Sequence, residues 1–154
     1  MRALRLLLCV ALVGWGCATN PATGRRQLIL MSEQQEVQTG RESDAEIRKQ
    51  MGVYNDPELQ RYVSSVGMKL VTQAHRPDLP WTFTVVDEPA VNAFALPGGF
   101  IYITRGILPF LRNEAELAGV IGHEIGHVDA RHSAEAYSKE LGAGLGLAVA
   151  GIFA

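Results

Sequence analysis

Almost all of this 154-residue sequence lacks cysteine. Cys9 and Cys17 are the only two, and both lie near the N-terminus, so residues 18–154 cannot form an internal disulfide. The formal net charge is -2, and the absence of a basic surplus argues against nucleic acid as a partner. The apolar runs at 6–13 and 141–154 are too short to cross a bilayer as helices. A folded domain must therefore rely on its core, a bound metal or a membrane tether.

The first 17 residues have the order of a secretory signal. Two arginines precede the apolar run Leu6–Val13, and small residues follow it, ending at Gly16 and Cys17. This order of charge, short apolar core and small residues is typical of exported proteins. The alternative is a buried N-terminal helix, but the charged start and the glycines at the end favour export.

Cys17 resembles the acceptor cysteine of a bacterial lipoprotein. Gly16 fits that pattern, whereas Gly14 and Trp15 are unusual at their positions; without lipidation, Cys17 is removed or left as a free thiol. A lipid chain would hold the protein on a membrane, since each buried methylene contributes about 0.8 kcal/mol. Ala18 after the cysteine resembles the outer-membrane sorting pattern, which predicts a location on the periplasmic face of the outer membrane.

The rest of the chain predicts an α+β fold. Residues 18–31 contain turn signals and two arginines and are predicted to form an extended tether. Helices are predicted from two start signals, a capping box at Ser32 with Gln35 and the pair Asp56-Pro57. Threonine, valine and aromatic residues predict strands at 81–87, 91–96 and 100–104. Helices before and after a small sheet are typical of the α+β class.

Another helix is predicted to begin at Asn113. Its apolar residues repeat with helical period, and Gly119, Gly122 and Gly126 share the opposite face. A glycine inside a helix costs roughly 0.5–1 kcal/mol against alanine. Three on one face therefore predict that another backbone packs there and that the helix is buried on both sides.

This helix carries His123-Glu124-Ile125-Gly126-His127, an H-E-x-x-H pattern. Histidines at i and i+4 lie on one helix face and can bind one metal ion, and zinc suits neutral imidazole nitrogen. Glu124, rotated about 100° from His123, would lie beside the metal and move protons as a general base. The pattern predicts one Zn²⁺ per chain and metal-assisted peptide hydrolysis. A surface helix with coincident histidines is the alternative.

Two neighbours of the motif are candidate partners of its histidines. His132 lies five residues beyond His127 and points elsewhere on an ideal helix, so a supporting or capping role is favoured over a role as ligand. Asp129 is placed to orient an imidazole from behind.

Two segments together resemble a known family. Residues 92–104, from Asn92 through the Pro97-Gly98-Gly99 turn to Thr104, and residues 116–127, with the H-E-x-x-H pattern, resemble the CAAX-prenyl-protease-like zinc metalloendopeptidases (minigluzincins). The segment from Cys17 to Arg25 is similar to their bacterial lipoprotein branch, whose members act in periplasmic quality control.

The resemblance implies roles for individual residues. His123 and His127 would be zinc ligands and Glu124 the general base. Asn92, Ala93, Phe94 and Ala95 would form the edge strand that binds extended or unfolded polypeptides by strand addition, although an ordinary strand is the alternative. The family's third zinc ligand is a glutamate well downstream, and a transition-state-stabilising histidine lies further on. Neither is reached before Ala154, so the chain resembles a truncated one.

The predicted organisation is a signal with a candidate lipidation site (1–17), a tether (18–31) and the N-terminal part of a zinc metallopeptidase domain (32–154). The predicted function is a lipid-anchored zinc metalloendopeptidase that hydrolyses extended or misfolded proteins at the bacterial cell envelope. A non-catalytic, chaperone-like binding lipoprotein and an inactive fragment are the alternatives.

Overall fold

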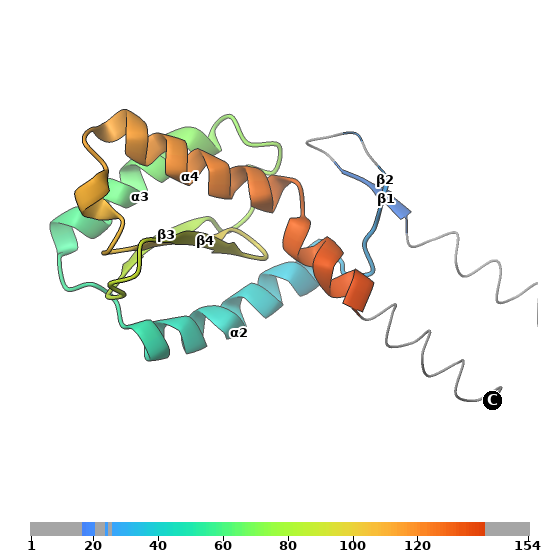
Figure 1. The fold of residues 1–154 in the computed structure, drawn as a ribbon. Coiled ribbons are helices and arrows are strands. Elements are labelled where there is room, and N and C mark those ends of the chain that lie inside the picture. Colours follow the sequence, from blue (N-terminus) through green and yellow to red (C-terminus); the bar gives the residue numbers. More distant parts are fainter. Residues whose placement is uncertain (1–16, 21–23, 25, 141–154) are drawn as a thin grey trace, which may run out of the picture.

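The structure is a computed structural model that describes residues 17–20, 24 and 26–140 (Figure 1). It confirms the α+β class, with helices on both faces of a small mixed sheet. Residues 1–16 of the predicted signal and the apolar segment 141–154 lie outside the described residues, so the structure does not test those predictions. Among the helices of the described part, none is both long and apolar enough to span a membrane.

The sheet has the strand order β3-β5-β4. β3 (Thr82–Val86) runs parallel to the central strand β5 (Phe100–Thr104), and β4 (Ala93–Leu96) runs antiparallel to it. β5 matches its predicted bounds, whereas β3 and β4 are shorter than predicted. β4 and β5 are joined at Gly98 and Gly99, whose φ angles of 81° and 98° are reached easily only by glycine. Because β4 is last in the strand order, it is an edge strand of this sheet.

The first two helices begin at the predicted signals. α2 spans Glu33–Met51, and Ser32 and Gln35 form the capping box through both of its reciprocal hydrogen bonds. α3 spans Pro57–Val71, and the Asp56 side chain accepts hydrogen bonds from the first turn. Local sequence chemistry therefore determines where both helices start.

The helices cover the sheet on two sides. α3 and α4 (Glu114–Asp129) lie on one face of the sheet and α2 lies on the other (Figure 1). The larger core cluster joins α3 and α4 to inward residues of β3 and β5, among them Ile101 and Ile103. A smaller cluster lies on the α2 side, around Phe100 and Tyr102. β5 is buried along its whole length because both faces are covered.

α4 has one buried face and one open face. Asn113 caps its first turn, and the buried residues of the helix include Leu117, Ile121 and Ile125. A Cβ atom added at Gly119, Gly122 or Gly126 would meet nothing within 4 Å among the described residues. The prediction that another backbone packs on this glycine face is therefore wrong for the described part of the chain, because α3 and the sheet contact only the apolar stripe.

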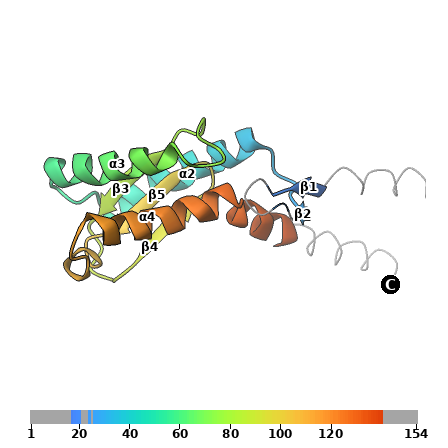
Figure 2. The same ribbon diagram turned by 90° about the horizontal axis from the view of Figure 1, so that it is seen from above.

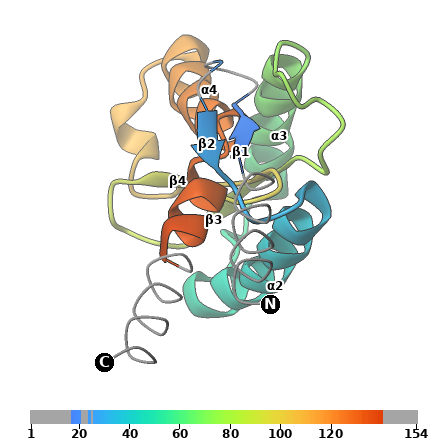
Figure 3. The ribbon, with the colours of Figure 1, turned by 90° about the vertical axis from the view of Figure 1, so that its right-hand side faces the viewer.

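The predicted tether is not extended throughout. β1 (Cys17–Thr19) and β2 (Arg26–Leu28) form an antiparallel pair at the end of the molecule where α4 finishes (Figures 2 and 3). The amide of Asn20 donates to the carbonyl of Ala130 (2.8 Å), and the N–H of Leu30 donates to Ser138 Oγ (2.9 Å). Ile29 and Met31 pack with Ala134. These contacts hold the segment against α4 and the helical residues 132–140 that follow it.

Candidate metal centre and active site

The two motif histidines point their rings at each other on α4. His123 Nε2 and His127 Nε2 are 3.0 Å apart, and the ring centroids are separated by 4.6 Å. Positions i and i+4 lie one above the other on a helix, which explains how one helix brings both rings together. His123 is exposed and His127 is partly buried, so the space between the two nitrogens is open to solvent.

This geometry fits two ligands of one metal ion. Two nitrogens bound to one zinc ion at about 2.0–2.1 Å with a tetrahedral angle lie about 3.3 Å apart. The observed 3.0 Å is within a few tenths of an ångström of that spacing. No group of three or more histidine, cysteine, aspartate or glutamate side chains able to hold a metal occurs in the described part of the chain. The described residues therefore bring two candidate ligands together.

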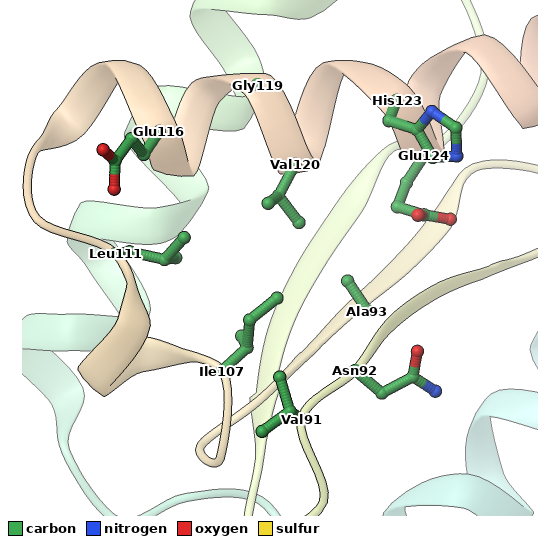
Figure 4. Close-up of a pocket in the computed structure, with 10 residues that line it drawn as sticks. All are labelled: Val91, Asn92, Ala93, Ile107, Leu111, Glu116, Gly119, Val120, His123 and Glu124. Atoms are coloured by element: carbon green, nitrogen blue, oxygen red, sulfur yellow. The ribbon is translucent and has the colours of Figure 1, made fainter.

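Glu124 lies beside these histidines and is buried, with 8% of its surface exposed. Within residues 17–20, 24 and 26–140, no hydrogen bond or ion pair reaches its carboxylate. A buried carboxylate without a partner is costly, so such groups mark functional sites more often than structural ones. Glu124 points from α4 into a cavity that it lines together with His123 (Figure 4).

The cavity has a volume of about 630 Å³ and lies between α4, β4 and the loop after β5. Its polar groups near the motif are His123, Glu124 and Asn92, and the rest of the wall is mainly apolar. Figure 4 shows Val120 pointing from α4 into the same space, opposite Ile107. The apolar lining consists of Val91, Ala93, Ile107, Leu111 and Val120. The site can therefore hold an apolar group next to the Glu124 carboxylate and the His123 imidazole.

β4 offers backbone groups beside this cavity. The Thr104 N–H donates to the Asn92 carbonyl (3.1 Å), so these residues form a hydrogen-bonded pair. Because such pairs alternate along an antiparallel ladder, the N–H and C=O groups of Ala93 and Ala95 point away from β5. The side chain of Phe94 stacks on Tyr102, with 4.9 Å between ring centroids, on the α2 side of the sheet. Of the four residues predicted to bind substrate, Asn92 and Ala93 line the cavity.

His132 lies beside the candidate ligand His127. Their Nδ1 atoms are 2.7 Å apart. If the His127 Nε2 faces a metal, its Nδ1 carries the proton and donates to His132 Nδ1, which fixes the tautomer that a ligand needs. The supporting role of His132 stays a prediction, and the distance between the two Nδ1 atoms is the geometry that this role needs.

Asp129 lies on another side of α4 and does not orient a motif histidine. Its Oδ2 accepts from the backbone N–H of His75 (2.8 Å) and lies 3.3 Å from the His75 ring nitrogen Nδ1. Its Oδ1 accepts from the Arg76 N–H (3.2 Å). Asp129 lies two residues beyond His127, or about 200° around the helix, so it faces the α3–β3 loop instead.

A buried ion-pair cluster at the end of α4 has no local signal in the sequence. Glu36, on a helix most of whose other polar residues face solvent, is only 1% exposed. Its carboxylate pairs with Arg76 Nη2 (2.7 Å) and with Arg131. Arg131 has a φ of 54°, in the left-handed region that costs a non-glycine residue roughly 1–2 kcal/mol. These residues are far apart in sequence, so helical periodicity could not reveal them.

Glu116 is the acidic group at the far rim of the cavity. Its carboxylate accepts from the Arg112 backbone N–H (2.8 Å) and from Arg112 Nε (2.9 Å). The backbone hydrogen bond first, and then the side-chain one, hold the pKa of Glu116 below its usual range. The Asn113 side chain accepts from the Glu116 N–H (3.0 Å), so Asn113 caps the predicted helix start, while the Glu116 carboxylate contacts Arg112.

Comparison with known proteins gives relatives with protease names. The chain is 36% identical over 122 residues to a beta-barrel assembly-enhancing protease of Escherichia coli, covering 79% of this chain and 25% of the relative. It is 38% identical over 99 residues to the mitochondrial metalloendopeptidase OMA1 of Arabidopsis thaliana, covering 64% of this chain and 20% of the relative. The chain thus spans about a quarter or less of the length of these relatives.

A family match covers the sheet and α4. Residues 57–153 match peptidase family M48, which confirms the metalloprotease part of the resemblance drawn from the sequence. The lipoprotein branch and the truncation remain predictions. Because the match extends over more than half of the chain, the chain belongs to peptidase family M48.

Proposed function

We propose that this chain supplies the zinc-binding and general-base part of a metalloendopeptidase active site. The observation that carries the proposal is the convergence of His123 and His127, whose Nε2 atoms are 3.0 Å apart, beside the buried carboxylate of Glu124. Membership of family M48 supports the same reaction class. The third zinc ligand and the stabiliser of the transition state would come from residues beyond those described.

Each residue would have a definite part in the reaction. His123 and His127 would hold the zinc ion through Nε2, and His132 would keep the proton of His127 on Nδ1. Zinc, when bound, supplies a Lewis acid that polarises the scissile carbonyl and makes water more acidic. Glu124 would accept a proton from the attacking water and return it to the leaving amine.

The substrate would be an extended polypeptide. The outward N–H and C=O groups of Ala93 and Ala95 would pair with its backbone, as in strand addition, which tolerates many sequences but needs an unfolded segment. Asn92 and Ala93 place that strand beside Glu124. The side chain of Phe94 stacks on Tyr102 away from the cavity, so Phe94 would contribute its backbone position rather than its ring.

The location would be the bacterial cell envelope. The relative in Escherichia coli is named a beta-barrel assembly-enhancing protease, and the sequence of residues 1–17 is typical of export. Lipidation of Cys17 would hold the chain on the periplasmic face of the outer membrane. The structure describes no side chain at Cys17, so the anchor rests on the sequence pattern alone.

A non-catalytic binding function is the alternative. The described residues bring two metal ligands together without a third, while β4 keeps a free edge next to an apolar cavity. An extended chain could bind there without zinc. This alternative and the protease share β4 but differ in their need for Glu124.

Two measurements test the proposal. Native mass spectrometry should find one zinc ion per chain, lost in His123→Ala. Cleavage of an unfolded model protein by the chain should stop on chelation and in Glu124→Gln, while Glu124→Gln retains zinc. A folded chain that binds no zinc would refute the metal centre. Binding of unfolded protein that is indifferent to chelator and to Glu124→Gln, without cleavage, would instead support the non-catalytic alternative.

A further inference from the structure

The carboxylate of Glu36 lies between two guanidinium groups. Its Oε2 is 2.7 Å from Arg76 Nη2, and its Oε1 pairs with the Nε of Arg131. The side chains of Glu36, Arg76 and Arg131 are only 2%, 8% and 16% exposed. A buried charge needs such partners, and loss of one leaves the others uncompensated. The cluster therefore fixes the relative positions of α2, the α3–β3 loop and the end of α4.

Arg131 is the residue at which α4 gives way to the next helical segment. Ala130 is the C-cap of α4, and Arg131 has a φ of 54° before the helical residues 132–140. Its guanidinium also donates to the Met31 carbonyl (2.7 Å). A non-glycine residue persists in this conformation only when its surroundings hold it there. Here Glu36 and Met31 hold it, and both come from one stretch at the start of α2.

The turn at Arg131 determines where His132 lies. His132 follows it directly and places its Nδ1 2.7 Å from the Nδ1 of His127. The other ring nitrogen of His127 faces His123 Nε2. A continuous path of contacts therefore leads from Glu36 through Arg131 and His132 to a metal-facing nitrogen.

The second guanidinium of the cluster supports the same end of α4. Arg76 Nη1 donates to the Val128 carbonyl (3.1 Å), which satisfies a backbone acceptor in the last turn and sets a positive charge at the helix C-terminus. Val128 is the residue after His127. Glu36 thus reaches both sides of the metal ligand through its two arginines.

We propose that Glu36 is a positioning residue for the metal ligand His127, acting through Arg131 and His132. The inference rests on the proposed divalent-cation site and adds to it a residue from α2, outside the stretch 57–153 that matches the family. Glu36 touches neither metal nor substrate. It holds the left-handed turn that keeps the His127 proton on Nδ1 and its Nε2 free for the metal.

The test measures the zinc affinity of the whole chain by competition with a chromophoric chelator. Glu36→Gln keeps the shape of the side chain and removes its charge. We expect zinc affinity to fall about 10–100-fold, the usual effect of losing a group that orients a metal ligand. Asp44→Asn is the matched control, because Asp44 is another acidic residue of α2 that pairs with an arginine. It accepts from Arg48 Nε (2.7 Å) and from the buried Tyr102 hydroxyl (2.6 Å). Its zinc affinity should stay within about twofold of the unaltered chain.

Arg131→Gly keeps the left-handed turn but removes the contacts of Arg131 with Glu36 and Met31. It is the second test variant if Glu36→Gln does not fold. Glycine adopts the left-handed conformation freely, but it has no side chain that can pair with the Glu36 carboxylate. We expect zinc affinity to fall by a similar factor, and the effects of Glu36→Gln and Arg131→Gly to be less than additive in the double variant. Long-range ¹H–¹⁵N spectra of the zinc-loaded proteins should show an Nδ1–H on His127 that exchanges slowly with solvent in the unaltered chain and in Asp44→Asn. In Glu36→Gln this proton should exchange rapidly.

The outcomes separate this inference from the proposed function. If the unaltered chain binds no zinc, the metal centre itself is wrong and the role of Glu36 falls with it. If the chain binds zinc and Glu36→Gln or Arg131→Gly binds it equally well, only the positioning role is overturned. Equal loss of affinity in Asp44→Asn would also overturn it, because the effect would then be one of general stability.

Discussion

The side-chain amide of Asn20 donates a hydrogen bond to the backbone carbonyl of Ala130, 110 residues further along the chain (2.8 Å). Ala130 is the C-cap of α4, whose last carbonyls have no partner within the helix. The segment before α2 therefore supplies a hydrogen bond at the end of the helix that carries the proposed metal ligands.

Asn20→Ala should destabilise the fold by about 1–2 kcal/mol, because the amide is 1% exposed and a buried acceptor loses its donor. The midpoint of urea unfolding measures this. Gln38→Ala, which removes an exposed hydrogen bond to Glu42 on α2, should change the free energy of unfolding by less than about 0.5 kcal/mol. An unchanged midpoint in Asn20→Ala would mean that the β1–β2 hairpin does not dock on α4 in solution.

Two glycine-to-alanine substitutions in helices should have opposite effects. At Gly119 a Cβ meets nothing within 4 Å among the described residues, so Gly119→Ala should stabilise the chain by roughly 0.5–1 kcal/mol. At Gly67 on α3 a Cβ would lie 2.5 Å from the ring of Phe83, so Gly67→Ala should destabilise it. Thermal unfolding of both variants measures the pair. Destabilisation by Gly119→Ala would show that another segment covers the glycine face of α4.

What packs on the glycine face of α4 could not be predicted from the sequence, whereas other features of the helices could. Helix starts at Ser32, Asp56 and Asn113 were predictable because caps act within one turn. The pairing of His123 with His127 was predictable for the same reason, since i and i+4 are neighbours on any helix. What covers a helix face depends on segments distant in sequence, and periodicity carries no information about them.

The same limit applies to Asp129 and Glu36. The sequence placed Asp129 near the motif because the two are close in number, but its position on the helix turns it toward His75. Glu36 lies on a helix with mostly polar, solvent-facing residues, and only the fold brings Arg76 and Arg131 to it. Long-range ion pairs of this kind leave no local pattern.

Val120→Phe should obstruct the cavity beside Glu124. Val120 points into the space of about 630 Å³ next to the Glu124 carboxylate, and a ring there would displace the proposed substrate. We expect kcat/KM for an unfolded protein substrate to fall about 10–100-fold, the cost of a misplacement of about 1 Å, with zinc stoichiometry unchanged. Met68→Phe, on an exposed position of α3, controls for the added ring. Unchanged cleavage in Val120→Phe would show that the substrate does not enter this cavity.

The lowered pKa of Glu116 predicts how the free energy of unfolding changes at acid pH. Its hydrogen bonds from Arg112 hold the pKa of the folded state below the usual glutamate range, so the unfolded chain binds the proton more readily. The contribution of Glu116 to stability is therefore complete above the usual glutamate pKa and is lost as the pH falls through the lowered pKa.

An NMR titration of the Glu116 carboxyl carbon should consequently give a midpoint below the usual glutamate value. The difference in free energy of unfolding between the unaltered chain and Glu116→Gln should be largest near neutral pH and should shrink as the solution is acidified. Glu42→Gln removes the same charge at an exposed position of α2, where Glu42 accepts from Gln38 rather than from an arginine, and it controls for the change in net charge. A midpoint at or above the usual value would mean that Arg112 does not hold Glu116 in solution and that this rim of the cavity is differently arranged.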